Sequence, residues 1–167
     1  IAGADAGTRG HLNAATINSG SALNVNGFGK VTADAVNLTA GTASFGADNQ
    51  LDVASLNIAG ASASTTGMTV NGELNLTSGS LIATGNVAST GDMTIGGQLS
   101  VTDANIDAGQ SVFLTGGSVD VTGVSVINGT AGTVISGAPT LNINASGDLT
   151  IGATAMIGIV LIKTAVG

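Results

Sequence analysis

The feature that most constrains this chain is a short apolar–any–apolar unit that recurs every six or seven residues. Met68-Thr-Val70, Leu74-Asn-Leu76 and Met93-Thr-Ile95 are examples, and Gly, Asn, Asp and Ser lie between such units. Alternation over so few residues is typical of a short strand with one buried face, and the intervening residues are those of tight turns. The sequence therefore predicts many short strands joined by tight turns.

The spacing of these units predicts how the strands are arranged. Between Met68 and Val121 the units begin at residues 68, 74, 81, 87, 93, 99, 106, 112 and 119, so every third start lies 18, 19 or 20 positions further on. Upstream, advances of 19 and 20 relate Leu12, Val31 and Leu51, and likewise Ile17, Val36 and Leu56. Three short strands in a turn of about 19 or 20 residues describe a triangular coil. Successive coils then stack as parallel strands about 4.8 Å apart.

We therefore predict an all-β fold, a right-handed triangular parallel β-helix (a β-solenoid) of roughly eight coils. The register is expected to be most regular between Met68 and Val121 and to loosen near Val124–Pro139. A β-sandwich fits less well because its strands usually recur every 8–12 residues or so. A helical fold is excluded because no window has a 3.6-residue stripe and Gly, at 27 of 167 residues, is too frequent.

The composition agrees with a narrow solenoid. Hydrophobic residues make up 43% of the chain, which is far more than a disordered chain contains. Aromatic residues make up only 2%, as expected for a narrow interior, and the corners need Gly because of their tight bends. We expect one solenoid domain over residues 1–167, with an edge or docking segment at 1–11, coils at 12–152 and a hydrophobic strand or docking segment at 153–167.

Charge and hydropathy exclude several classes of partner. The net charge is −7, and Arg9, Lys30 and Lys163 are the only fixed cations, so nucleic-acid binding is not expected. The mean hydropathy of +0.48 is high, yet no run reaches the roughly 18 apolar residues that would span a membrane. The absence of Cys excludes disulfides and thiol metal sites.

Catalytic, cofactor and metal sites are not predicted. The ten acidic residues are scattered, and Asp103, Asp107 and Asp120 form the nearest approach to a cluster. Glycoside hydrolysis needs paired carboxylates, and the single histidine, His11, has no evident partner for base catalysis or metal binding. We predict that the chain is not an enzyme and has no cofactor. A polysaccharide-active β-helix enzyme is a remote alternative.

An ice-binding protein is a second remote alternative, because some solenoids present flat arrays of threonine. Thr39, Thr77 and Thr115 recur two coils apart, but Ala59 and Gly96 occupy the coils between them. The array is therefore interrupted.

Stacking of the coils should align identical side chains. Asn37, Asn57 and Asn75 occupy the middle of the same strand in three successive coils and should point outward. They could form an amide ladder along the rod, as stacked Asn side chains do in cross-β structures. The alternative is that Asn is simply a common outward residue here. Thr94 and Phe113 continue the column, so the ladder should not run the full length.

The ends of a solenoid present unpaired strand edges, which must be capped or used for assembly. The segment Met156–Val166 is the most hydrophobic part of the chain. One hypothesis is that it docks onto another subunit by strand addition, so that head-to-tail association gives a filament. The alternative is that it is the last buried strand of the stack. The candidate assembly residues are Met156, Ile157, Ile159, Val160, Leu161, Ile162 and Val166.

Three stretches carry a family resemblance: Gly72-Glu-Leu-Asn-Leu-Thr-Ser-Gly79, Gly91-Asp-Met-Thr-Ile-Gly-Gly97 and Gly147-Asp-Leu-Thr-Ile-Gly152. Over about residues 12–152 the chain resembles the shaft repeats of filamentous haemagglutinin-like adhesins, exported by two-partner secretion, and of autotransporter passengers. Those families also stack coils of nearly the same length with Gly and Asn turns. The Asn-Pro turn motifs of their secretion domain are absent from this sequence.

The resemblance implies an extracellular or cell-surface location. It also implies a structural role, as a shaft or a self-assembling filament subunit of a prokaryotic surface that supports adhesion or a biofilm matrix. The alternative is an adhesin module that binds a host or cell-surface ligand on one lateral face. No functional residue is carried over from those families.

Overall fold

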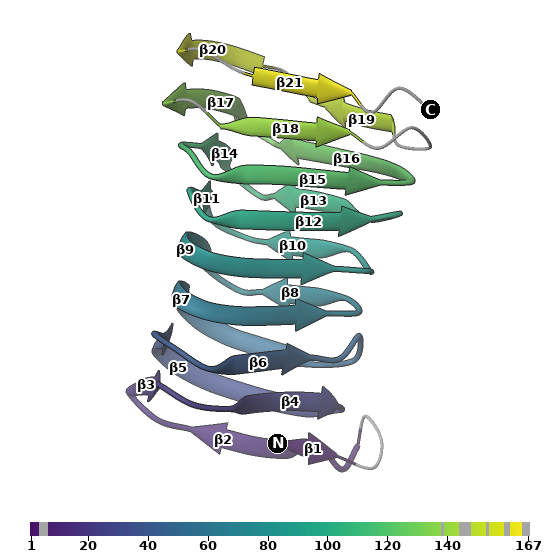
Figure 1. The fold of residues 1–167 in the computed structure, drawn as a ribbon. Helices are drawn as coiled ribbons and strands as arrows, with labels where there is room; N and C mark the ends of the chain where they lie inside the picture. Colours follow the sequence, from purple (N-terminus) through teal and green to yellow (C-terminus); the bar gives the residue numbers. More distant parts are fainter. Residues whose placement is uncertain (4–6, 138, 144–147, 153, 159–160, 165–167) are drawn as a thin grey trace.

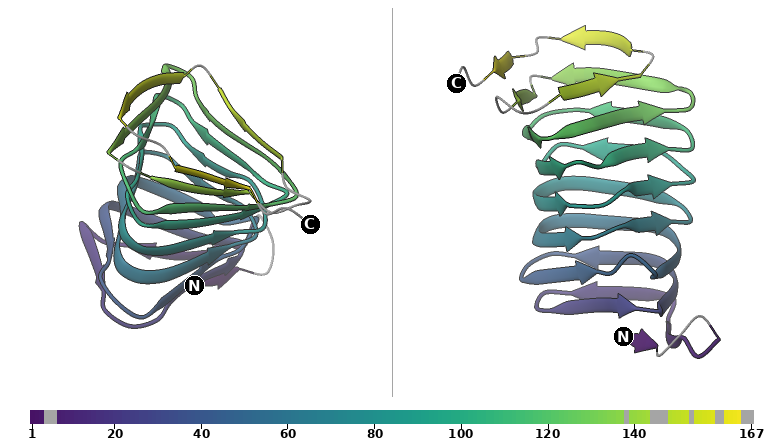
Figure 2. Two further views of the ribbon diagram at one scale, coloured as in Figure 1. Left: turned by 45° about the horizontal axis from the view of Figure 1, so that its top comes forward. Right: turned by 90° about the vertical axis from the view of Figure 1, so that its right-hand side faces the viewer.

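The chain forms a single stack of parallel strands that winds through about seven turns (Figure 1). The computed structural model describes residues 1–3, 7–137, 139–143, 148–152, 154–158 and 161–164. Front strands in Figure 1 run from left to right while the chain rises from its N-terminal to its C-terminal end, so the winding is right-handed. Seen closer to the axis, the coils are triangular (Figure 2). The predicted β-solenoid is confirmed, with about seven turns against the roughly eight expected.

Each side of the triangle is a column of parallel strands, which we call the first, second and third face. The first face contains β2 (Gly10–Asn13), the start of β5 (Gly29–Leu38), the start of β7 (Gln50–Thr65), β8 (Met68–Val70), β10 (Val87–Ser89), β13 (Asn105–Ala108), β16 (Val124–Gly129) and β19 (Asp148–Ile151).

The second face contains β3 (Thr16–Ser19), the end of β5, the middle of β7, the start of β9 (Glu73–Ala83), β11 (Met93–Ile95), β14 (Ser111–Leu114), β17 (Gly132–Gly137) and β20 (Thr154–Gly158). The third face contains β4 (Leu23–Gly27), β6 (Thr42–Phe45), the ends of β7 and β9, β12 (Gln98–Thr102), β15 (Ser118–Thr122), β18 (Thr140–Ile143) and β21 (Leu161–Thr164).

The predicted columns pair in register. On the three faces the partners are Met68, Val87 and Ile106; Leu74, Met93 and Val112; and Leu81, Leu99 and Val119. Further upstream, Leu12, Val31 and Leu51 pair on the first face, and Ile17, Val36 and Leu56 pair on the second. The spacing of apolar residues was therefore sufficient to set the pairing of neighbouring coils.

The core fills the triangle with one layer of inward side chains per coil. Leu56, Ile58 and Leu114 are at most 1% exposed, and inward and outward positions alternate along each strand. Phe45 is also buried, at 2% exposure, although the narrow interior favours aliphatic side chains. Its neighbours in the same inward row include Val25 and Thr65, which are smaller and leave room for the ring.

The stack changes beyond Val121. From Leu12 up to this point, paired residues of neighbouring coils lie 18, 19 or 20 positions apart in the sequence, as Met68 and Val87 do. The next pairing on the third face joins residues 22 positions apart, such as Asp120 and Asn142. Here two polar side chains, Ser125 and Thr133, take inward positions and are fully buried. The expected loosening near Val124–Pro139 is thus a lengthening of the coil, because β16 and β17 still pair with their neighbours.

The two ends of the stack differ. At the N-terminal end, β1 (Ala2–Gly3) pairs with β4, and the amide of Asn26 donates to the carbonyl oxygen of Ile1. This contact covers part of the β4 edge. At the other end, β19, β20 and β21 form the last described coil.

The hydrophobic segment predicted for assembly contributes to that last coil. Met156 pairs through its backbone with Ile135 in β17, and Ile162 pairs with Leu141 in β18. Ile157 and Leu161 belong to the same two strands, β20 and β21. Ile159, Val160 and Val166 lie outside the described residues. The described part of the chain contains no helix, and therefore none that is long and apolar enough to cross a membrane.

Candidate functional site

A ladder of asparagine side chains runs along the outside of the second face. Asn37 Nδ2 donates to Asn18 Oδ1 at 2.8 Å, Asn57 Nδ2 donates to Asn37 Oδ1 at 2.8 Å, and Asn75 Nδ2 donates to Asn57 Oδ1 at 3.1 Å. Each interior amide therefore donates to one coil and accepts from the next. Because Asn37, Asn57 and Asn75 are only partly exposed, water competes less well for these bonds. The ladder ties four successive coils together.

Asn18 is a member of this ladder that the sequence analysis missed. It lies in β3 and pairs in register with Asn37. Asn18 does not stand in an apolar–any–apolar unit, because the residue after it is Ser19. In the next two coils Leu38 and Ile58 follow Asn37 and Asn57. The same outward row continues through Thr94 and Phe113, so the amide ladder ends after Asn75.

The three threonines considered for an ice-binding array are exposed, but their hydroxyls bond to the neighbouring coil. The hydroxyl of Thr39 donates to the carbonyl oxygen of Ser19, that of Thr77 to Ile58, and that of Thr115 to Ile95. Each bond joins a threonine to the coil below it. These hydroxyls therefore connect neighbouring coils at the end of the second face.

Asp120 is the centre of a polar group on the third face. Its carboxylate accepts hydrogen bonds from Asn142 Nδ2 at 2.5 Å, Ser118 Oγ at 3.2 Å and Gln98 Nε2 at 3.3 Å. The donors come from three successive coils, on β18, β15 and β12. This group is a second set of side-chain hydrogen bonds between coils, in which the central acceptor is a carboxylate and not an amide.

The other predicted cluster members lie elsewhere. Asp103 stands at a corner with a positive φ of 47°, and its Oδ1 accepts a hydrogen bond from the backbone amide of Val124 at 2.9 Å. Asp107 belongs to β13 on the first face, so the fold does not bring it together with Asp120. His11 is exposed in β2, where its partner in register is Lys30. Among the described residues, no group of three or more His, Cys, Asp or Glu could hold a metal ion.

A concave polar surface lies on the first face of the N-terminal coils. It consists of two adjoining hollows of about 550 and 490 Å³, which share Asp52 and Asn71 in their linings. We call the two together the first-face trough. The larger hollow is bordered by Arg9, Lys30, Asp48, Gln50 and Thr69, and the smaller one by Asn13, Thr32 and Asp34.

The centre of the trough is a small charged network. Lys30 Nζ lies 2.5 Å from Asp52 Oδ2, and Asn71 Nδ2 donates to the other oxygen of the same carboxylate. The hydrogen bond from Lys30 holds the pKa of Asp52 below its ordinary value, with a further contribution from Asn71, while burial opposes the shift. The carboxylate is therefore kept ionised and oriented by two neighbouring coils.

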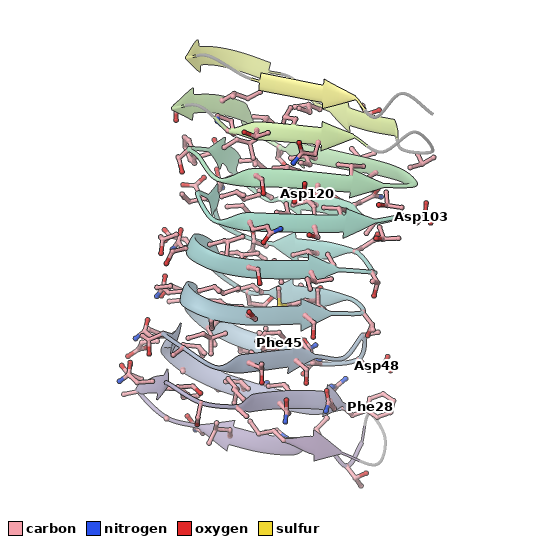
Figure 3. The ribbon with its side chains drawn as sticks, viewed as in Figure 1. Phe28, Phe45, Asp48, Asp103 and Asp120 are labelled. Carbon is pink, nitrogen blue, oxygen red and sulfur yellow. The ribbon has the colours of Figure 1, made fainter. Side chains whose placement is uncertain are left out.

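The corner beside the trough is also ordered by specific contacts. Arg9 Nη1 donates to the carbonyl oxygen of Asp48 at 2.7 Å, and the guanidinium lies 5.5 Å from the centroid of the Phe28 ring. Figure 3 shows Phe28 and Asp48 projecting at this corner of the lower coils. Asn49, the residue after Asp48, is 7% exposed, and its Nδ2 donates to the carbonyl oxygen of Gly46. The corner that carries Asp48 is thus fixed by the contacts of Arg9 and by the hydrogen bond of Asn49.

In the sequence, Arg9 and Lys30 stand out only as two of the three fixed cations. A usable signal was present, because the coil period places Asn13, Thr32, Asp52 and Asn71 in one outward row of the first face. Reading that row beside Lys30 would have predicted a polar patch. The hollows themselves depend on side-chain lengths and corner shape, which periodicity does not describe.

Comparison of the chain with protein-family models, with curated proteins and with solved structures gives no significant match.

Proposed function

We propose that this chain is a structural shaft, a rigid segment of a prokaryotic cell-surface or extracellular assembly that supports adhesion or a matrix. The observation that carries the proposal is the unbroken parallel pairing on all three faces, from β2, β3 and β4 up to β19, β20 and β21. The backbone hydrogen bonds of this pairing join neighbouring coils and therefore run along the rod. A continuous aliphatic core runs inside the same coils.

This arrangement suits a mechanical role. Bending or stretching the rod would have to break several hydrogen bonds on three faces at once, and each coil contacts only the coils above and below it. The asparagine ladder and the Asp120 group add side-chain bonds in the same axial direction. The role is proposed to be structural and not catalytic, because Asp103 and Asp120 are occupied with bonds between coils.

End-to-end association is part of the proposal. The strand edges of β20 and β21 have the same direction as the strands beneath them, so a further coil can add by the parallel pairing already present in the stack. That coil could come from a second copy of the chain. Such heterologous contact repeats without closing and gives a filament. Met156, Ile157, Leu161 and Ile162 would lie in the joining coil.

The extracellular setting rests on the resemblance to haemagglutinin-like and autotransporter shafts. Coil length, Gly and Asn corners and the scarcity of charge support it. The setting would be tested by raising antibodies and asking whether they label intact cells of the source organism. Labelling only after permeabilisation would contradict a surface location.

The assembly proposal is tested by electron microscopy and light scattering of the purified chain over a wide concentration range. Rods that lengthen with concentration are expected. Uniform monomers at every concentration would rule out self-assembly. A variant without Ile1–Gly3 sharpens the test, because β1 covers part of the β4 edge that an incoming coil would use. Removing it should favour association.

A ligand-binding adhesin module is the second candidate function. The observation that favours it is the first-face trough, with its ordered charged and amide side chains. A screen against glycans and matrix proteins separates the two candidates, since a pure shaft should bind neither.

A further inference from the structure

We propose that the first-face trough binds a short, weakly acidic oligosaccharide, with one carboxylate of the sugar placed between Arg9 and Lys30. The inference rests on the ligand-binding candidate above and is independent of the shaft proposal. Each hollow, at about 550 and 490 Å³, falls in the range of small-molecule sites, roughly 300–1,000 Å³. The larger hollow is bordered mainly by charged and amide side chains, which favours a hydrated ligand over an apolar one, while Ala14, Ala33 and Val53 form part of the wall of the smaller hollow.

The balance of charge limits the kind of ligand. Arg9 and Lys30 supply two positive charges, while Asp34, Asp48 and Asp52 supply three negative ones. A polyanion such as a heavily sulfated glycan or a nucleic acid would be repelled by these carboxylates and by the net charge of −7. A ligand with a single carboxylate placed near Arg9 and Lys30 would be attracted by these two cations and would meet much less repulsion than a polyanion. The guanidinium of Arg9 has five N–H donors and the ammonium of Lys30 has three, so both can serve a ligand besides their present partners.

The remaining side chains suit the hydroxyl groups of a sugar. The carboxylates of Asp34 and Asp52 accept hydrogen bonds from hydroxyls, whereas Asn13, Thr32 and Asn71 can both donate and accept. These residues are carried by strands or strand ends in successive coils, so their spacing follows the coil repeat of about 4.8 Å. A chain of sugar rings presents hydroxyls on a comparable scale.

The trough is also preorganised. The Lys30–Asp52–Asn71 network joins three coils before any ligand is present, and Arg9 is held by Asp48 and Phe28. Side chains that are fixed in advance lose less conformational entropy on binding. A site on rigid strands therefore offsets part of the cost of holding a flexible sugar.

The test uses calorimetric titration of the full chain with a tetrasaccharide that contains glucuronic acid. Its carboxyl-reduced, neutral counterpart and a heparin tetrasaccharide are titrated in parallel. The acidic sugar should bind most tightly, and reduction of its carboxyl should weaken binding by about tenfold, the factor typical of losing one charged hydrogen bond. Tighter binding of heparin, or no binding of the acidic sugar at millimolar concentration, would overturn the proposal.

Variants assign the effect to residues. Arg9→Gln and Lys30→Gln should each weaken binding of the acidic sugar by about tenfold and should barely change binding of the neutral one. Lys163→Gln is the matched control, because it removes the same charge from β21 at the other end of the stack. An equal loss in Lys163→Gln would show that only net charge matters and would refute the site.

A second measurement guards against misfolded variants. Amide chemical shifts of the unmodified chain should change on the first face, around Lys30, Asp52 and Asn71, when the acidic sugar is added. Changes confined to other faces would contradict the proposal. Rod formation is measured on the same samples by electron microscopy. Rods that do not bind the sugar would contradict only the sugar-binding proposal. Monomers that bind the sugar would contradict only the assembly proposal.

Discussion

The coils between Met68 and Val121 differ from those that follow. In the first group, paired residues of neighbouring coils lie 18, 19 or 20 positions apart, and every large inward side chain is apolar. In the second group this separation rises to between 21 and 24 positions, as between Val124 and Asp148, and Ser125 and Thr133 are buried in the interior. Both groups keep parallel pairing on three faces. Backbone pairing therefore tolerates a longer coil and a polar core position, and side-chain packing is what distinguishes the two groups.

The outside of the second face changes at an earlier point in the stack, after Asn75. The outward row is occupied by amides from Asn18 to Asn75 and by Phe113 and Val134 higher up. Axial side-chain bonds thus add to the backbone ladder in the earlier coils, while this row lacks amides in the later ones. We expect the later coils to open first when the stack unfolds, because local stability follows burial and bonding.

The largest effect should come from emptying the core in the regular coils. Leu114 and Ile135 are neighbours in one inward row, in β14 and β17 on either side of the change in coil length. Leu114→Ala should cost about 2–5 kcal/mol of unfolding free energy, as large-to-small core changes do. Ile135→Ala should cost less, because the polar core beside it is easier to rearrange. Urea denaturation measures both, and equal losses would mean that the two groups are packed equally well.

Thr133 provides a change in the opposite direction. Its hydroxyl is fully buried and has no hydrogen-bond partner in the part of the chain that the structure describes. Thr133→Val keeps the shape and removes the unpaired group, so it should stabilise the later coils by about 1–2 kcal/mol. Thr115→Val is the control, since it removes a hydroxyl bonded to Ile95 and should be neutral or destabilising. A loss of stability in Thr133→Val would show that the hydroxyl has a partner after all.

The asparagine ladder should have a smaller effect. Asn57→Ala removes the donor to Asn37 Oδ1 and the acceptor of Asn75 Nδ2, at a cost of about 1–2 kcal/mol. Asn18→Ala removes one ladder bond at the exposed end and should cost less than half as much. Hydrogen exchange of the second-face amides would locate the loss in the early coils. Equal costs at both positions would mean that the ladder does not act as a connected row.

Much of this fold could be predicted from the spacing of apolar residues. Inward positions such as Leu74, Met93 and Val112 repeat at the coil length, and a narrow interior leaves few alternatives for pairing them. The coil beyond Val121 was harder to predict, because a longer turn and an inward Thr133 both interrupt the regular spacing of apolar residues that is present in the earlier coils. A longer corner shifts the residue at which the next strand begins, while the residue types within that strand stay the same, so the spacing no longer gives the register.

The surface was less predictable than the core. The asparagine row followed from the coil period, since stacking at fixed register places identical outward residues beside each other. The first-face trough did not, because it joins Arg9, which precedes β2, to Lys30 and Asp52 in later coils through long side chains. The reach and direction of such side chains depend on corner geometry. Apolar periodicity carries no information about that geometry.

The smallest effect concerns the Lys30–Asp52 pair, which should make the early coils sensitive to acid. The pKa of Asp52 is lowered from its ordinary value of 3.8, chiefly by the hydrogen bond from Lys30. The folded state therefore binds this proton less readily than the unfolded state, so the stabilisation is present above the ordinary value and disappears as the pH falls through the folded pKa. Both side chains are partly exposed, which limits the contribution to about 0.2–1 kcal/mol.

The measurement for this pair is the unfolding free energy of the unmodified chain and of Asp52→Asn at pH 7 and at about pH 2, below the ordinary value of the carboxyl. The difference between the two proteins should shrink in acid, because protonation removes the same charge as the substitution. Lys30→Gln is the control and should abolish most of the pH dependence assigned to Asp52. If the difference in unfolding free energy between the two proteins stays constant between the two pH values, Asp52 acts through the hydrogen bond that it accepts from Asn71 and not through its charge. In that case the early coils would owe their stability to the same kind of neutral axial bonding as the asparagine ladder, and the charged trough would add nothing to it.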